Sequence, residues 1–176
     1  MASRRLINSV CIVVLAITGS LTIAVPVDVG SGDNSAGLYI EWGDGYVVEF
    51  LVRFEDATVS GLGLFDIVEA ETTLTTVRED FGWGILIDGI SYDGHSDAGF
   101  GGGEDWWHYW IKNAGQTEWM SPAYGAVDRT LADGDSDGWI YGRAGAVPEP
   151  ATVALLSLGA LLVLKRKRET NGHRKD

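Results

Sequence analysis

The chain has 176 residues, with 25 acidic and 13 basic side chains, seven Trp, 24 Gly and one Cys. This length has room for one domain rather than two. Five of the basic and 22 of the acidic residues lie within 25–146, so this segment carries a net charge of −17. Phosphate binding needs a basic surface, which argues against nucleic acid as a partner. All seven Trp lie in the same segment, so we expect a folded core rather than disorder.

Residues 1–24 have the features of a secretory signal peptide. Two arginines precede an apolar stretch, and Thr22 and Ala24 occupy the minus-three and minus-one positions of a cleavage site. We therefore expect the secretion translocon and signal peptidase as partners. The alternative is an uncleaved N-terminal anchor, which polar residues within the stretch disfavour. Because the only cysteine, Cys11, lies here, the exported part is expected to have neither a disulfide nor a cysteine nucleophile.

The C-terminal end combines an apolar segment with a basic cluster. Residues 151–164 carry no charge. Four consecutive cations follow: Lys165, Arg166, Lys167 and Arg168. As a helix the apolar segment spans about 21 Å, less than the roughly 30 Å hydrocarbon core, but flanking cations snorkel and bilayers thin. We expect a transmembrane helix, a membrane stop at the four cations and a cytoplasmic tail over 169–176. The alternative, a buried helix of the body, would attach all four cations to the core.

A proline motif precedes the apolar segment and consists of Val147, Pro148, Glu149 and Pro150. With the two features that follow it, over 147–168, this motif resembles the PEP-CTERM sorting signal of exported proteins in Gram-negative bacteria. The resemblance implies that an exosortase, a membrane transpeptidase, recognises the motif and removes the tail. It also implies a protein anchored in the inner membrane before processing and then placed on the cell surface or in the extracellular matrix. Such proteins are common in bacteria that make exopolysaccharide, which makes that polysaccharide a candidate partner.

Between the two ends we expect a linker over 25–36 and one α+β body over 37–143. The segments 38–42 and 46–54 predict a β-hairpin, because apolar and polar residues alternate in the second of them. Apolar spacing and a capping Ser predict a short helix within 60–72. Further strands are predicted over 74–77, 83–90, 106–112, 117–121, 127–131 and 139–141. One helix among several strands indicates a small mixed β-sheet with the helix on one face.

Two segments of the body receive more specific predictions. Residues 91–104 are rich in glycine and predict a long loop that is either functional or mobile. Residues 106–112 carry large aromatic side chains on both faces, which predicts a central strand of the sheet.

The second half of the body resembles a known domain. The residues concerned are Trp107-His108-Tyr109-Trp110, Trp119, Tyr124-Gly125-Ala126, Leu131-Ala132-Asp133-Gly134-Asp135 and Trp139. Their pattern is similar to the β-grasp domain at the C-terminus of transcobalamin-type proteins. The resemblance implies a β-grasp-like α+β fold, flanked here by the N-terminal signal helix and the C-terminal transmembrane helix. The corrin ligand of that family is not carried over, because short aromatic and turn motifs recur in domains without a ligand.

Three alternate carboxylates, Asp133, Asp135 and Asp137, resemble the first half of a calcium loop. The twelfth position of such a loop would be Ala144, where a bidentate Glu is required. This departure favours an acidic β-turn. A weak Ca²⁺ site completed by groups from elsewhere is the alternative, and no other cofactor is expected.

Acidic and histidine side chains gather around the glycine-rich segment: Asp93, His95, Asp97, Glu104, Asp105 and His108. Such groups suit a transition metal or an acid–base pair, but no recognised metal-ligand spacing is present. The sequence also lacks a nucleophile elbow and a phosphate-binding glycine loop. We therefore expect a protein that is not an enzyme and has no catalytic residue.

An aromatic face is the remaining candidate site. Trp106, His108 and Trp110 share one face of the predicted strand 106–112, where they are suited to stack on a ligand such as a sugar ring. The other interpretation, which the sequence favours, is that these rings fill the core of a small domain without disulfides.

Taken together, the sequence predicts an exported, surface-sorted structural or binding protein of the cell envelope or exopolysaccharide matrix. The first alternative is a surface-displayed module that binds a small ligand or a glycan. The second alternative is an exported hydrolase.

Overall fold

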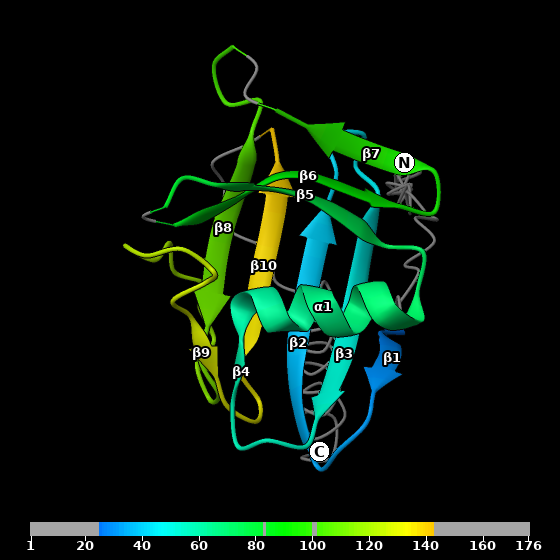
Figure 1. The fold of residues 1–176 in the computed structure, drawn as a ribbon, viewed down its shortest axis with the longest axis vertical. Coiled ribbons are helices and arrows are strands. Elements are labelled where there is room, and N and C mark those ends of the chain that lie inside the picture. The colour runs from blue at the N-terminus through cyan, green and yellow to red at the C-terminus, as the bar shows by residue number, and fades with distance from the viewer. Residues whose placement is uncertain (1–24, 83, 100–101, 143–176) are drawn as a thin grey trace, which may run out of the picture.

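The computed structural model describes residues 25–82, 84–99 and 102–142, which form three β-sheets and one helix (Figure 1). In chain order the elements are β1 (Val27–Gly30), β2 (Asn34–Glu41), β3 (Val47–Phe54), β4 (Val59–Ser60), α1 (Gly61–Glu71), β5 (Thr75–Asp80), β6 (Ile85–Tyr92), β7 (His95–Ala98), β8 (Trp107–Lys112), β9 (Thr130–Leu131) and β10 (Ser136–Tyr141).

The largest sheet has five strands in the order β1-β3-β2-β10-β8. β2 and β3 form the predicted antiparallel hairpin, and β10 lies parallel to β2 and antiparallel to β8. Helix α1 crosses one face of this sheet, and the β5-β6-β7 sheet crosses the same face further along (Figure 1). β4 and β9 form a separate short pair. Because β8 is the last strand in the order of the large sheet, it is an edge strand.

The core lies between this sheet and the elements that cross it. Alternate residues of β3 are buried, as its pattern of apolar and polar residues predicts. From the helix, Leu64, Phe65 and Val68 are fully buried, and the Phe65 ring meets the edge of Trp139 on β10. Trp42, which follows β2, donates its indole N–H to the carbonyl of Ile90 at 2.9 Å and so joins β6 to the large sheet.

Helix α1 begins and ends with side-chain caps. The Ser60 hydroxyl accepts a hydrogen bond from the amide of Gly63 at 3.0 Å. At the other end the Thr72 hydroxyl donates to the carbonyl of Val68 at 2.8 Å. The first contact satisfies an amide that the start of a helix leaves unpaired. The second is an additional bond to a carbonyl that already accepts the Thr72 amide at 2.9 Å. The prediction of a capped helix within 60–72 is thus confirmed.

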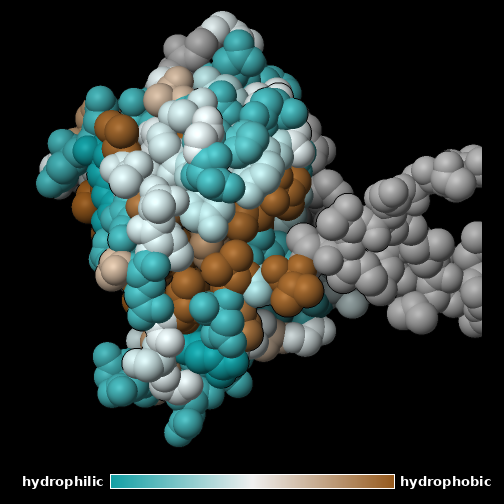
Figure 2. All heavy atoms as spheres, turned by 90° about the vertical axis from the view of Figure 1, so that its right-hand side faces the viewer, coloured by the Kyte–Doolittle hydropathy of each residue, from teal (hydrophilic) through white to brown (hydrophobic). Residues whose placement is uncertain are grey.

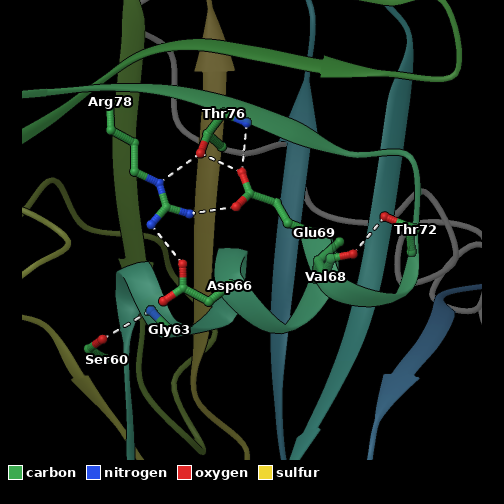
Figure 3. Close-up of polar contacts among 8 residues, drawn as sticks. All are labelled: Ser60, Gly63, Asp66, Val68, Glu69, Thr72, Thr76 and Arg78. Carbon is green, nitrogen blue, oxygen red and sulfur yellow. Dashed lines mark hydrogen bonds and ion pairs between the residues drawn. The ribbon is translucent and has the colours of Figure 1, made fainter.

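A polar network holds the β5–β6 hairpin beside the helix (Figure 3). The Arg78 guanidinium on β5 pairs with Asp66 at 2.7 Å and with Glu69 at 2.9 Å, both on α1. Its Nε donates to the Thr76 hydroxyl, which in turn donates to Glu69. Since the participants come from two elements, the network sets where the hairpin lies relative to the helix.

The fold class expected from the sequence is wrong. The described residues are mostly β-sheet with one short helix, and their strands belong to three sheets rather than one small mixed sheet. The cause is the segment 75–98, which pairs with itself as β5-β6-β7 instead of joining the large sheet. A mixed sheet crossed by one helix conflicts little with the β-grasp resemblance, but it is only part of the structure.

The two flanking helices of that prediction lie on 1–24 and 151–164, outside the described residues. Among residues 25–82, 84–99 and 102–142 no helix is long and apolar enough to cross a membrane.

Three predictions for segments also need correction. The expected linker 25–36 supplies β1 and the start of β2, because its residues pair with β3. The expected loop 91–104 contains β7, which pairs with β6. The expected central strand 106–112 is the edge strand β8. Its neighbouring strand is β10, on one side. Other segments, such as Trp119 and the strand β6, cover its aromatic side chains on the two faces.

The side of the molecule on which β1 lies is mainly hydrophilic (Figure 2). Apolar atoms form a band at mid-height on this side, between hydrophilic regions above and below. This distribution agrees with the high negative charge of the segment 25–146 and with a core that lies inside the layers.

Arg78→Ala tests the network that fixes the hairpin. We expect the free energy of unfolding to fall by about 1–2 kcal/mol, because two charge-assisted contacts are lost and Glu69 keeps only its bonds to Thr76. Urea unfolding measures this change. Arg53→Ala is the matched control, since Arg53 pairs with Asp28 in a more exposed position. We expect a smaller loss there. An equal loss in both variants would contradict the role given to Arg78.

Candidate functional site

A buried polar network lies where β8, β10 and the segment before β9 meet. Asp137 on β10 is 0% exposed, and its carboxylate accepts a hydrogen bond from the Tyr109 hydroxyl at 2.7 Å. Arg129 Nε donates to the other oxygen of Asp137 at 3.3 Å, and Arg129 Nη2 lies 3.4 Å from Asp135. The network therefore ties the edge strand to the chain segment that leads into β9.

The start of helix α1 also lies against this network. A Cβ added at Gly61 would lie 2.8 Å from Asp137 Oδ2 and 2.8 Å from the carbonyl oxygen of Ala126. Glycine is therefore required at a helix position where it is otherwise unfavourable. This close approach explains why the helix begins with a glycine.

Burial and nearby charges together shift the pKa values of three ionisable groups, Asp137, Tyr109 and Arg129. Burial raises the pKa of Asp137 to about 6, although Tyr109 and Arg129 both act to lower it. Burial and the nearby Asp137 raise the pKa of Tyr109, so its hydroxyl stays protonated and donates. Burial alone would lower the pKa of Arg129, but Asp137 and Asp135 raise it above its usual value. At neutral pH the network thus holds a cation between two carboxylates.

The three carboxylates of the proposed calcium loop do not converge. Asp133 accepts the Ser35 amide at 2.8 Å, and Asp135 accepts the amides of Ala114 and Ala132. Asp137 belongs to the buried network. Within the described ranges no group of three or more His, Cys, Asp or Glu side chains is placed to hold a metal ion. The carboxylates act as turn and core partners, which agrees with the acidic turn that the sequence favours over a calcium site.

The acidic and histidine residues around 91–104 are also dispersed. His95 Nδ1 lies 2.6 Å from Asp44, and its ring stacks on Tyr46 at 3.8 Å. Asp97 accepts the amide of Gly43 at 2.7 Å. His108 instead lies on β8, where its ring contacts Trp106. His95, Asp97 and His108 thus make separate contacts, which join turns and strands.

A groove runs along the edge of β8. Two cavities, of about 300 Å³ and about 730 Å³, share the lining residues Ile85, Leu86, Pro122, Tyr124 and Gly125. We call the two together the β8 groove. One wall is the edge of β8, the second comes from β6 and the turn before it, and the third is the segment 121–128.

The predicted aromatic platform forms part of this groove. Trp106, His108 and Trp110 all line the 300 Å³ cavity. The same cavity is lined by Trp107, Tyr109 and Trp139, which lie toward the opposite face of the sheet. Both faces contribute because the cavity lies at an edge of the sheet. The structure therefore brings the three predicted residues together, but at an open strand edge rather than on a flat face.

Two indole groups of the groove residues have an unusual environment. Nε1 of Trp110 and Nε1 of Trp139 are buried, and neither has a hydrogen-bond partner among the described residues. An unpaired buried N–H costs about 1–3 kcal/mol. Both donors thus lie below the surface, on residues that line the inner part of the groove.

The sequence did not indicate the outer part of the groove or Arg129. Phe81, Tyr124 and Val127 are 49%, 42% and 38% exposed and line the 730 Å³ cavity, but they come from segments remote from β8. Only the folded chain brings these segments together. For Arg129 a signal exists, because it is the one basic residue between Lys112 and Arg143 in a strongly acidic segment. An isolated cation of this kind indicates a carboxylate partner.

Asp137→Asn tests the buried network through pH. Burial raises the pKa of Asp137 from 3.8 to about 6, so the folded state binds this proton more tightly than the unfolded state. The stability gained from this protonation is present at low pH and is lost as pH rises through about 6. The wild type should therefore gain about 2 kcal/mol relative to the variant when pH falls from 7 to 4. Other carboxylates titrate in both proteins, so the comparison isolates Asp137. Urea unfolding across this pH range is the measurement.

Tyr109→Phe provides the companion variant. It removes a hydrogen bond that lowers the pKa of Asp137, so the pH window should move upward. Parallel stability profiles for the wild type and Asp137→Asn between pH 4 and 7 would contradict the assignment.

The predicted sorting residues Val147, Pro148, Glu149 and Pro150 and the membrane stop Lys165, Arg166, Lys167 and Arg168 lie outside the described residues. Comparison with curated proteins and with solved structures gave no match. A family model of the PEP-CTERM protein-sorting motif matches residues 146–168 and confirms the resemblance found in the sequence. The motif implies an exported protein that an exosortase processes and that is sorted to the cell surface.

Proposed function

We propose that the chain is a surface-sorted binding protein without enzymatic activity, which uses the β8 groove to hold a component of the cell envelope or exopolysaccharide matrix. The groove itself carries this proposal. It combines exposed apolar side chains at its outer end with buried, unpaired indole donors on residues that line its inner end. Concave sites with mostly apolar walls and a few placed polar groups are typical of ligand binding.

The walls of the groove are held in place by the contacts described above. Arg129 and Asp137 position the segment that leads from 121–128 into β9, and Arg78 positions the β5–β6 hairpin. A site with walls fixed by buried or multiple contacts binds with a smaller loss of conformational freedom. This arrangement supports binding more than a role as a passive spacer.

The distribution of ionisable groups supports a role other than catalysis. Asp137, the carboxylate with the largest change in pKa, is fully buried and hydrogen-bonded to Tyr109 and Arg129. A general acid or base must reach its substrate, and this carboxylate has no exposed surface. The histidines His95 and His108 are engaged in separate contacts.

A glycan-binding module is the second candidate function. The observation that favours it is the presence of Trp106 and Trp110 in one cavity, since aromatic side chains offer apolar surface with a polar handle. For export, we propose in addition that the segment 151–164 anchors the chain in the inner membrane until the exosortase acts.

Glu149→Ala tests the sorting step. The wild type recovered from envelope and medium should end near Pro150, whereas the variant should keep residues 151–176, because the exosortase no longer recognises its motif. Intact-mass spectrometry distinguishes the two lengths. If the wild type also keeps the tail, the segment is a plain membrane anchor and the processing step is wrong.

Tyr124→Ala combined with Val127→Ala tests the groove. These exposed side chains line the outer cavity, so the double variant should fold and be processed but be released from the matrix fraction into the medium. Immunoblotting of fractions gives the ratio, and we expect at least a roughly fivefold shift toward the medium. Val77→Ala, which removes an exposed apolar side chain on β5 away from the groove, is the control. Equal retention of the wild type, the double variant and the Val77→Ala control in the matrix fraction would contradict the proposal.

A further inference from the structure

Part of the β8 backbone points toward the groove. On this side the amide and carbonyl of Ile111 bond to Met120, at 2.8 and 2.9 Å. Backbone groups of alternate residues in a strand point to the same edge. The N–H and C=O groups of Trp107 and Tyr109 therefore point away from β10 as well. No strand among the described residues pairs with β8 on this side beyond the single bridge at Ile111.

The space beside these groups is the inner part of the β8 groove. Trp107 and Tyr109 both line the 300 Å³ cavity, whose far wall is formed by Ile85, Leu86 and Ile87 of β6. An added strand would lie about 4.8 Å from β8 and would pair with peptide groups that have no strand partner among the described residues. Its side chains would alternate between the two faces of the sheet, and both faces are apolar here.

Charge indicates what kind of chain fits. The segment 25–146 carries a net charge of −17, so pairing two copies through β8 would bring two strongly acidic bodies together. Among the described residues that line the groove, Asp128 is the only Asp or Glu and no Lys or Arg is present. A neutral or basic segment of another polypeptide meets both conditions, and a second copy of this chain does not.

We propose that the β8 groove binds an extended, apolar segment of a neutral or basic partner protein, which adds to the sheet by pairing with Trp107 and Tyr109. This inference rests on the proposed function and names the class of ligand for the same groove. Strand addition uses main-chain hydrogen bonds for affinity and neighbouring pockets for side-chain selection. A glycan would use the rings of Trp106 and Trp110 but has no repeating peptide groups to pair with the strand edge.

Hydrogen exchange of individual amides tests the pairing directly. The processed protein from the native source is mixed with a short synthetic peptide in which Val and Thr alternate between pairs of Lys. We expect exchange at the amides of Trp107 and Tyr109 to slow at least about tenfold, because both become hydrogen-bonded in the complex. The amides of His108 and Trp110 already face β10 and serve as internal controls.

A peptide with the same side chains but N-methylated between the Lys pairs is the matched control ligand. It lacks the donors that strand pairing needs, so it should bind at least about tenfold more weakly by tryptophan fluorescence. Equal binding of the two peptides, or unchanged exchange at Trp107 and Tyr109, would overturn the inference. Protection of these amides by a neutral oligosaccharide from the matrix, and not by the peptide, would overturn it in favour of a glycan.

The two proposals fail in distinguishable ways. If Tyr124→Ala with Val127→Ala releases the protein from the matrix while the peptide does not bind, the groove is a binding site but its ligand is not a polypeptide strand. If the double variant is retained like the wild type, the proposed function itself fails.

Discussion

The contact between Arg129 and Asp137, deep in the core, is the interaction on which the rest of the structure depends. Asp137 is fully buried, and it also accepts the hydrogen bond from Tyr109 and lies against the first residue of α1. One carboxylate thus connects the edge strand, the strand beside it, the start of the helix and the segment that enters β9. Removing one partner would leave an uncompensated buried charge, which is far more costly than losing an exposed pair.

The same contact explains why a groove exists at the edge of β8. The cation holds the chain after Ala126 close to the core, and this leaves the residues from Pro122 to Val127 to form an outer wall. Arg78 places the opposing hairpin by pairing with the helix. In the described part of the chain, the outer edge of β8 is paired at one point, by the bridge between Ile111 and Met120. Aromatic side chains line the space beside the rest of this edge. The groove thus has its shape because Arg129 and Arg78 hold its two outer walls in place through their contacts with carboxylates.

Local patterns predicted the local elements, and long-range pairing decided the rest. The hairpin of β2 and β3 and the capped helix were predictable, because alternation and a capping Ser act within a few residues. The sorting motif was predictable because it is read from the sequence itself. The edge position of β8 was not predictable, because large aromatic residues on both faces, such as Trp107 and Trp110, are typical of a central strand. In the structure, other segments cover these side chains. The partners of Asp133 and Asp135 were not predictable either, because Ser35 and Ala114 are distant from them in the chain.

The most direct test of the groove as the extracellular binding site is photo-crosslinking in living cells, with a photoreactive amino acid placed at Tyr124 and, separately, at Val77 as a control. Both side chains are exposed, but only Tyr124 lines the groove. We expect the probe at Tyr124 to form, after processing, an adduct with an extended segment of another exported protein. Mass spectrometry should map this segment to a neutral or basic apolar sequence. Equal adducts at both positions, or none at Tyr124, would contradict it.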